Sequence, residues 1–117
     1  MDVNNPIIKL CTVGTAAEFA GKIDEAKALY RQAWDAATDD YEACIAAHYV
    51  ARHQVQPAEA LRWNQIALDR AMAVGDERVT AFMPSLYLNM GRSYEILGNR
   101  PMAQHFYDLA AALGFPH

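Results

Sequence analysis

The sequence predicts an all-α fold of three helical hairpins, and this prediction depends on composition, on paired alanines and on their spacing. Alanine is the commonest residue while valine, isoleucine and threonine are few, which favours helix over sheet. Three segments each carry two alanines seven residues apart. Seven residues are close to two helical turns, so each pair marks one narrow stripe of a helix. The pairs are Ala26 with Ala33, Ala60 with Ala67, and Ala103 with Ala110.

The spacing between these segments has the length of a helix–turn–helix repeat. Ala26 and Ala60 are 34 residues apart, whereas Ala60 and Ala103 are 43 apart, and we assign the extra length to extension of the fourth and fifth helices. Each hairpin of such an array needs a neighbour to cover its second face, so three is about the smallest stable number. We expect one domain over residues 1–117, with repeats at about 7–40, 41–74 and 84–117 and a helical extension over 75–83.

Local start and stop signals predict six helices with short joints. Proline or a capping side chain stands at most expected starts, and glycine at most expected ends. Asp40 is the expected cap of the third helix, and Pro84 either kinks a long helix or starts a new one. The first four helices are expected near 6–20, 24–37, 40–54 and 57–74, the fifth before Gly98, and the sixth from Pro101 to Gly114.

Composition and charge narrow the class of protein. Hydrophobic residues make up 53% of the chain, enough for a core, and 14 acidic against 10 basic residues give a net charge of −4. No basic cluster is long enough to follow a phosphate backbone, and no apolar run is long enough to span a membrane. The amino terminus lacks signal-peptide features, and two cysteines fit a reducing compartment. We expect a cytoplasmic protein without nucleic-acid or membrane partners.

Candidate chemistry in the chain is sparse. Cys44 and His48 are four residues apart on one helix face, but His53 points elsewhere and no spacing supplies a third metal ligand. A buried cysteine beside a packed histidine is the commoner arrangement. Ser85 and Ser93 lack the glycine turn that presents a nucleophilic serine. We expect no enzyme, metal or cofactor. Two alternatives stay open, a self-assembling structural unit and a ligand-binding or metal-binding domain on the Cys44/His48 face.

The three repeats share a wider pattern with a known family. The third carries Leu88, Met90-Gly91, Tyr94, Gly98, Ala103, Tyr107 and Ala110. The first carries Val13-Gly14, Gly21, Ala26, Tyr30 and Ala33, with Ala17 at the place of Tyr94. The second keeps Ala60, Ala67 and Leu68 but has Ala47-His48 for the hydrophobic–glycine pair and Asn64 for the aromatic residue. In these residues, over roughly 7 to 114, the chain resembles the tetratricopeptide repeat family.

The resemblance implies an α-solenoid of three hairpins whose first helices line a concave groove. Its stretched second interval is similar to the longer-period arrays of bacterial peptide-sensing regulators and kinesin light chains. Such a module binds a peptide or protein surface without catalysis. The expected groove residues are Tyr49, Arg52, His53, Asn89 and Arg92, and the alternative is that these are only the solvated faces of amphipathic helices.

The last predicted helix suggests self-association. At about 100° per residue, its apolar side chains cover an arc of about 160°. Ala103, Tyr107 and Ala110 are expected to pack within their own hairpin. The remaining residues of the arc are expected to face outward and form a homodimer, unless Phe115 folds over them or they bind the partner. These residues are Met102, Phe106, Leu109 and Leu113.

Overall fold

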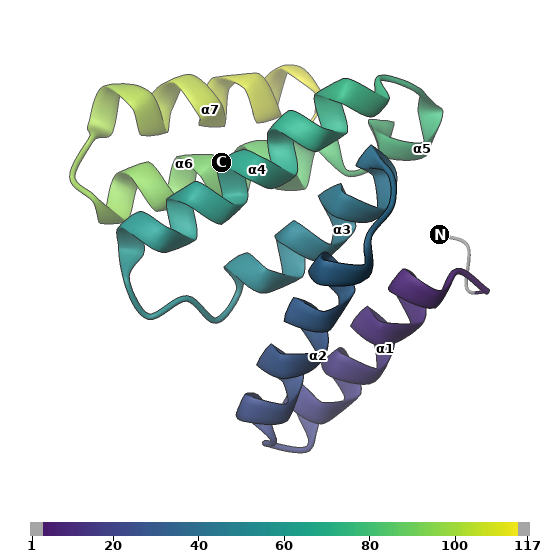
Figure 1. The fold of residues 1–117 in the computed structure, drawn as a ribbon. Coiled ribbons are helices and arrows are strands. Elements are labelled where there is room, and N and C mark those ends of the chain that lie inside the picture. The colour runs from purple at the N-terminus through teal and green to yellow at the C-terminus, as the bar shows by residue number, and fades with distance from the viewer. Residues whose placement is uncertain (1–3, 115–117) are drawn as a thin grey trace.

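The computed structural model describes residues 4–114, which form seven helices and no strand within that range (Figure 1). The all-α prediction is therefore confirmed. The helices are α1 (Pro6–Phe19), α2 (Ile23–Ala36), α3 (Asp40–Ala51), α4 (Pro57–Val74), α5 (Glu77–Thr80), α6 (Met83–Ile96) and α7 (Arg100–Ala112).

Consecutive long helices pack in pairs, α1 with α2, α3 with α4, and α6 with α7 (Figure 1). The middle pair contacts both others, because α2 and α1 pack on α3 while α6 packs on α4. The α1–α2 and α6–α7 pairs therefore lie at opposite ends of the molecule. The first helices of the pairs, α1, α3 and α6, are the ones predicted to line a groove.

A seventh helix separates α4 from α6, so the expected number of six helices is wrong. Gly75 ends α4 with a φ of 63°, a left-handed conformation that glycine adopts without strain. Asp76 then caps a new helical turn, because its Oδ1 accepts a hydrogen bond from the Arg78 backbone at 2.9 Å. Val79 anchors this turn in the core. Pro84 lies in the first turn of α6, where it starts the helix rather than kinking it.

The start of α3 differs from the prediction by one residue. Asp39, not Asp40, is the cap, because Asp39 has extended backbone and its carboxylate accepts from the Glu42 N–H at 2.8 Å. Glu42 reaches back to the Thr38 backbone N–H at 2.9 Å and also accepts from Asn5 Nδ2 at 2.9 Å. These bonds join the start of α1 to the start of α3. The far end of α3 also comes earlier than expected, at Ala51.

The paired alanines lie where the helices approach each other, with one exception. Ala26, Ala33, Ala67 and Ala110 are fully buried, and Ala103 is 4% exposed. Such small side chains allow close helix packing. Ala60 is only partly buried although it has the same position in the middle pair. This difference marks the middle pair as less tightly closed on one side.

Two glycine–tyrosine contacts explain the close approach in the outer pairs. A Cβ atom on Gly14 would lie 2.5 Å from the Tyr30 ring, and one on Gly91 would lie 2.5 Å from the Tyr107 ring. Only glycine therefore leaves room for these rings to pack flat on α1 and α6. Both rings are buried. The same contact thus closes the first and the third pair.

The outward stripe predicted on α7 is wrong for its central residue. Phe106 is 8% exposed and packs against the rings of Tyr87 and Tyr94, with centroid distances of 6.2 and 5.8 Å. The apolar arc is wide enough for α6 to contact both sides of it, so Phe106 is covered within the chain. Met102 and Leu109 also pack partly against the core, and Leu113 alone of the four is mostly exposed, at 51%. Phe115 lies outside the described residues.

Candidate functional site

Glu18 in the last turn of α1 binds the end of α3 through a compact polar network. The Arg52 guanidinium donates to both carboxylate oxygens, at 3.2 Å from Nε and 2.8 Å from Nη2. His53 Nε2 lies 2.6 Å from Oε1, and the Tyr30 hydroxyl donates to the same oxygen at 2.6 Å. The Glu18 side chain is only 10% exposed. The network joins the first and middle pairs at the edge of the predicted groove.

These contacts determine the charge state of Glu18. Burial raises the pKa of its carboxyl, but hydrogen bonds from Arg52, Tyr30 and His53 and the Arg52 charge outweigh burial and lower the pKa to about 2. Glu18 is therefore ionised at neutral pH. Burial and the hydrogen bond to Glu18 raise the pKa of Tyr30 to about 12, so this phenol keeps its proton. The Arg52 charge is compensated inside the protein.

The aromatic groove residue Tyr49 packs against the same network. Its ring stacks on Tyr30 with a centroid distance of 5.0 Å and an interplanar angle of 26°. The His53 ring is nearly parallel to Tyr30 at 6.3 Å. Because Tyr30 comes from α2, Tyr49 from α3 and His53 from the turn after α3, these contacts hold the predicted groove face in a fixed position.

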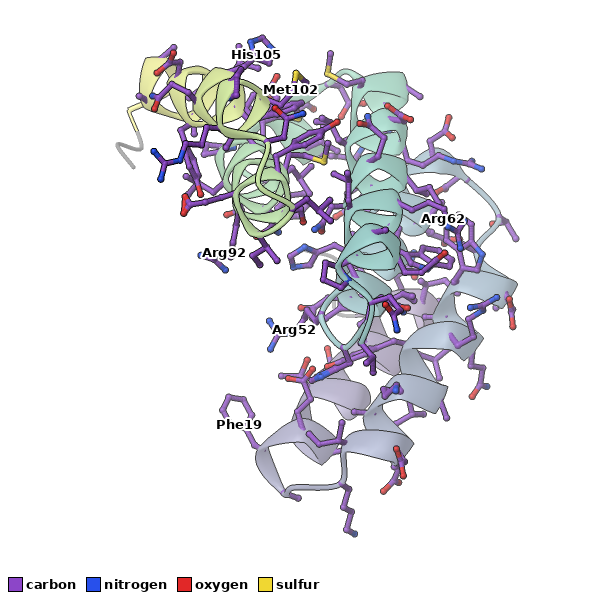
Figure 2. All side chains as sticks on the ribbon, turned by 90° about the vertical axis from the view of Figure 1, so that its left-hand side faces the viewer. Phe19, Arg52, Arg62, Arg92, Met102 and His105 are labelled. Atoms are coloured by element: carbon purple, nitrogen blue, oxygen red, sulfur yellow. The ribbon has the colours of Figure 1, made fainter. Side chains whose placement is uncertain are left out.

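A pocket of about 410 Å³ opens between α3, α4 and α6, and we call it the central pocket. Four of the five predicted groove residues line it, from two different helix pairs. Its described lining contains no aspartate or glutamate. Figure 2 shows Arg52 and Arg92 extending to the same side of the molecule. The lining residues are His48, Ala51, Arg52, His53, Gln54, Ala60, Asn64, Asn89, Arg92, Ser93 and Ile96.

The two arginines of the central pocket differ in their electrostatic environment. Arg52 is bound to Glu18 through two hydrogen bonds. Arg92 is exposed, and its side chain makes no ion pair or hydrogen bond within residues 4–114. Arg92 therefore supplies a cationic group that an incoming partner can use without displacing an internal contact.

Two polar residues of the central pocket were not expected at the site. Asn64 Nδ2 donates to Ser93 Oγ at 2.9 Å, and His48 Nδ1 lies 3.4 Å from Asn89 Nδ2. Burial and the Arg52 charge lower the pKa of His48, so its imidazole is neutral at pH 7. The signal was present in the sequence, because His48 and Asn64 are among the positions at which the second repeat departs from the other two.

The Cys44/His48 face forms a separate, smaller pocket of about 170 Å³. Burial raises the pKa of the Cys44 thiol to about 11 and that of Cys11 to about 12, so neither is a thiolate at neutral pH. No group of three histidine, cysteine, aspartate or glutamate side chains within residues 4–114 is placed to hold a metal ion. The alternative of a metal site on this face thus has no ligand set in the described chain.

The surface opposite the central pocket carries two tryptophans packed against arginines. Trp34 and Trp63 pack edge to face at 5.1 Å, and the guanidinium groups of Arg31 and Arg62 lie over the Trp63 ring at 5.3 and 5.0 Å. In Figure 2, Arg62 points away from Arg52 and Arg92. The Arg31 and Arg62 guanidinium groups are therefore already engaged in cation–π contacts with Trp63. Arg62 provides a matched control for Arg92.

No protein-family model, curated protein or solved structure matches the chain. Within the described residues, none of the helices combines the length and the apolar character needed to cross a bilayer.

Proposed function

We propose that this chain is a tetratricopeptide-like helical module that binds an extended peptide along α3 and α6, without catalysis. The observation that carries the proposal is that Arg52, His53, Asn89 and Arg92, predicted from sequence as groove residues, line one pocket. Tyr49 stands next to them on α3 and packs on Tyr30. Side chains from two helix pairs thus converge on one surface, as a peptide groove requires.

The chemistry of the central pocket suits a peptide. Asn64 and Asn89 offer amide groups that can both donate to and accept from a peptide backbone. Arg92 offers a cation for an acidic or aromatic side chain. The helices that carry these residues are packed on each other, so little order is lost on binding. These properties favour recognition over a reaction.

The test is selection of binding peptides from a random displayed library, followed by titration calorimetry on the selected sequences. We expect Arg92→Ala to weaken binding by about tenfold or more, the effect of losing a charge-assisted hydrogen bond. Asn89→Ala should weaken it less. Arg62→Ala removes an arginine from the opposite surface and should leave the affinity unchanged.

Arg52→Ala is unsuitable for this test because it would leave Glu18 without its guanidinium partner. Failure to select any peptide would contradict the proposal. So would selected peptides that bind Arg92→Ala and Asn89→Ala as tightly as the unchanged protein.

Homodimerisation stays a separate prediction. Phe106→Glu would place a charge in the core of one chain, so it cannot test the interface. Leu113→Glu changes an exposed residue of the same stripe. Sedimentation at micromolar concentration should show a dimer that Leu113→Glu converts to monomer, and a monomer in both cases would contradict the prediction.

A further inference from the structure

The Tyr30 ring is packed between its own helix pair and the next one. The ring packs flat on Gly14 of α1, and its hydroxyl donates to Glu18 one turn further along α1. From the next pair, Tyr49 stacks on the ring and His53 lies parallel to it. One aromatic side chain thus fills the space between three helices.

Tyr107 has the same relation to its own pair. Its ring packs on Gly91, and its hydroxyl donates to Glu95 at 3.0 Å. The glycine, the glutamate and the tyrosine have the same mutual spacing as Gly14, Glu18 and Tyr30. The first and third pairs therefore use one and the same set of contacts.

The middle pair has different residues at every one of these positions. By the repeat spacing, Asn64 takes the place of Tyr30, His48 that of Gly14 and Arg52 that of Glu18. On the following pair, Arg92 takes the place of Tyr49, and Ile96 that of His53. All five line the central pocket. The pocket is therefore the counterpart of the space that the Tyr30 ring occupies.

The replacements explain why this space is open. Asparagine is much shorter than tyrosine, and Asn64 is held against Ser93 by a hydrogen bond. His48 has its Nδ1 toward Asn89 of α6 and so does not close the space. Ala60, which borders the pocket, stays partly exposed while its counterparts are buried. The volume of about 410 Å³ lies in the range of pockets that hold small organic groups.

We propose that the central pocket binds a tyrosine side chain of the partner peptide, whose ring lies beside His48 in the part of this space that His48 leaves open. This inference depends on the proposed function. The Arg92 guanidinium replaces Tyr49 and suits the face of an aromatic ring. Ile96, Ala51 and Ala60 supply apolar contacts, and Arg52 replaces Glu18 as the group nearest the phenol oxygen, to which it donates.

A carboxylate or phosphate is the competing occupant, because the described lining has no acidic residue. Two features favour the phenol. Arg52 is already compensated by two hydrogen bonds from its guanidinium to Glu18, which leaves Arg92 as the one arginine of the pocket without an internal partner in the described chain. The apolar residues of the pocket would contact a ring but would gain nothing from a small anion.

The test uses p-cresol as a probe of the tyrosine side chain, with acetate and inorganic phosphate for comparison. In ¹⁵N–¹H correlation spectra, p-cresol should shift the amides around His48, Arg52, Asn64 and Arg92 in a saturable manner. The double substitution His48→Gly/Asn64→Tyr rebuilds the closed contact of the outer pairs. It should abolish these shifts while the circular dichroism spectrum stays unchanged.

Two further variants keep the test decisive. Arg62→Tyr adds a tyrosine on the opposite surface and should leave p-cresol binding unchanged. Arg92→Ala should weaken it by about two- to fivefold, as expected for loss of a cation–π contact. This second variant decides the question if the double variant does not fold.

The inference is overturned if p-cresol causes no saturable shifts at the pocket, or if acetate or phosphate causes them in its place. Its failure differs from failure of the proposed function. Selected peptides that bind the groove without any aromatic residue would overturn the tyrosine pocket and leave peptide binding standing. Absence of selected peptides would overturn peptide binding, while saturable p-cresol shifts at the pocket would still support the ring site.

Discussion

The outer helix pairs and the middle pair share one backbone plan but close it differently. In the outer pairs a tyrosine ring packs directly on a glycine of the facing helix. In the middle pair His48 and Asn64 stand at these places, and a pocket of about 410 Å³ opens beside them. The comparison shows that the tyrosine–glycine contact of the outer pairs is absent from the middle pair, where the space beside His48 and Asn64 is open.

The strongest test of this comparison removes the aromatic residue from a closed pair. Tyr30→Ala should lower the free energy of unfolding by about 3–5 kcal/mol, because the ring is fully buried and its loss leaves a cavity. Asn64→Ala, at the equivalent place, should cost only about 1 kcal/mol through loss of its hydrogen bond to Ser93. Urea unfolding measures both. Equal costs for the two variants would show that the pairs do not differ as described.

A smaller loss of stability is expected when an alanine at a helix crossing is replaced by a larger residue. Ala103→Leu should cost about 1–3 kcal/mol, because Ala103 is buried at a closed crossing and a larger side chain overpacks it. Ala60→Leu should cost less, because part of its side chain faces the central pocket. Thermal melting of the two variants measures the difference. A wild-type melting temperature for Ala103→Leu would contradict the proposed repeat register.

The smallest effect concerns the network that borders the pocket. Glu18→Gln should cost about 1 kcal/mol at pH 7, since Arg52 is about half exposed and such ion pairs contribute little. The pKa of Glu18 is lowered from 4.5 to about 2 in the fold, so the ionised carboxylate stabilises the protein above pH 4.5. That contribution is lost as the pH falls from 4.5 to 2.

Urea unfolding of the unchanged protein and of Glu18→Gln between pH 7 and pH 2 measures this contribution. The difference between them should shrink as the pH falls from 4.5 toward 2, where the Glu18 carboxyl of the folded protein is about half protonated. Glu25→Gln, at an exposed position of α2, serves as the control for replacing a carboxylate on the surface. A difference that does not depend on pH would mean that Glu18 acts by packing rather than by charge.

The sequence predicts the helices well because their signals are local. Pro6 and Pro57 mark the starts of α1 and α4, and Gly75 marks the end of α4, as expected. A capping contact involves only neighbouring residues, so its sequence is enough to identify it. The cap of α3 was wrong by one residue because Asp39 and Asp40 are equally suitable side chains, and only the backbone conformation distinguishes them.

Features that depend on three-dimensional packing were harder to predict. The side of α7 to which Phe106 belongs depends on how α7 lies on α6, which the helical periodicity does not contain. The contact of Glu18 with Arg52 and His53 requires the ends of α1 and α3 to meet. For the central pocket, the unusual residues His48 and Asn64 were recognised, but the open space also depends on the position of α6.

The polar contacts between α1 and α3 have a mechanical consequence for the groove. A hydrogen bond from Asn5 to Glu42 connects the starts of these two helices, and the ion pair of Glu18 with Arg52 connects their ends. The first two pairs are therefore held together at both ends. Between α3 and α6 the side-chain hydrogen bond of the described residues is the long one of 3.4 Å from Asn89 to His48, and α6 is held on the middle pair by its packing on α4. A partner that inserts between α3 and α6 therefore needs to replace one weak hydrogen bond, while the helix packing on either side of the pocket stays in place.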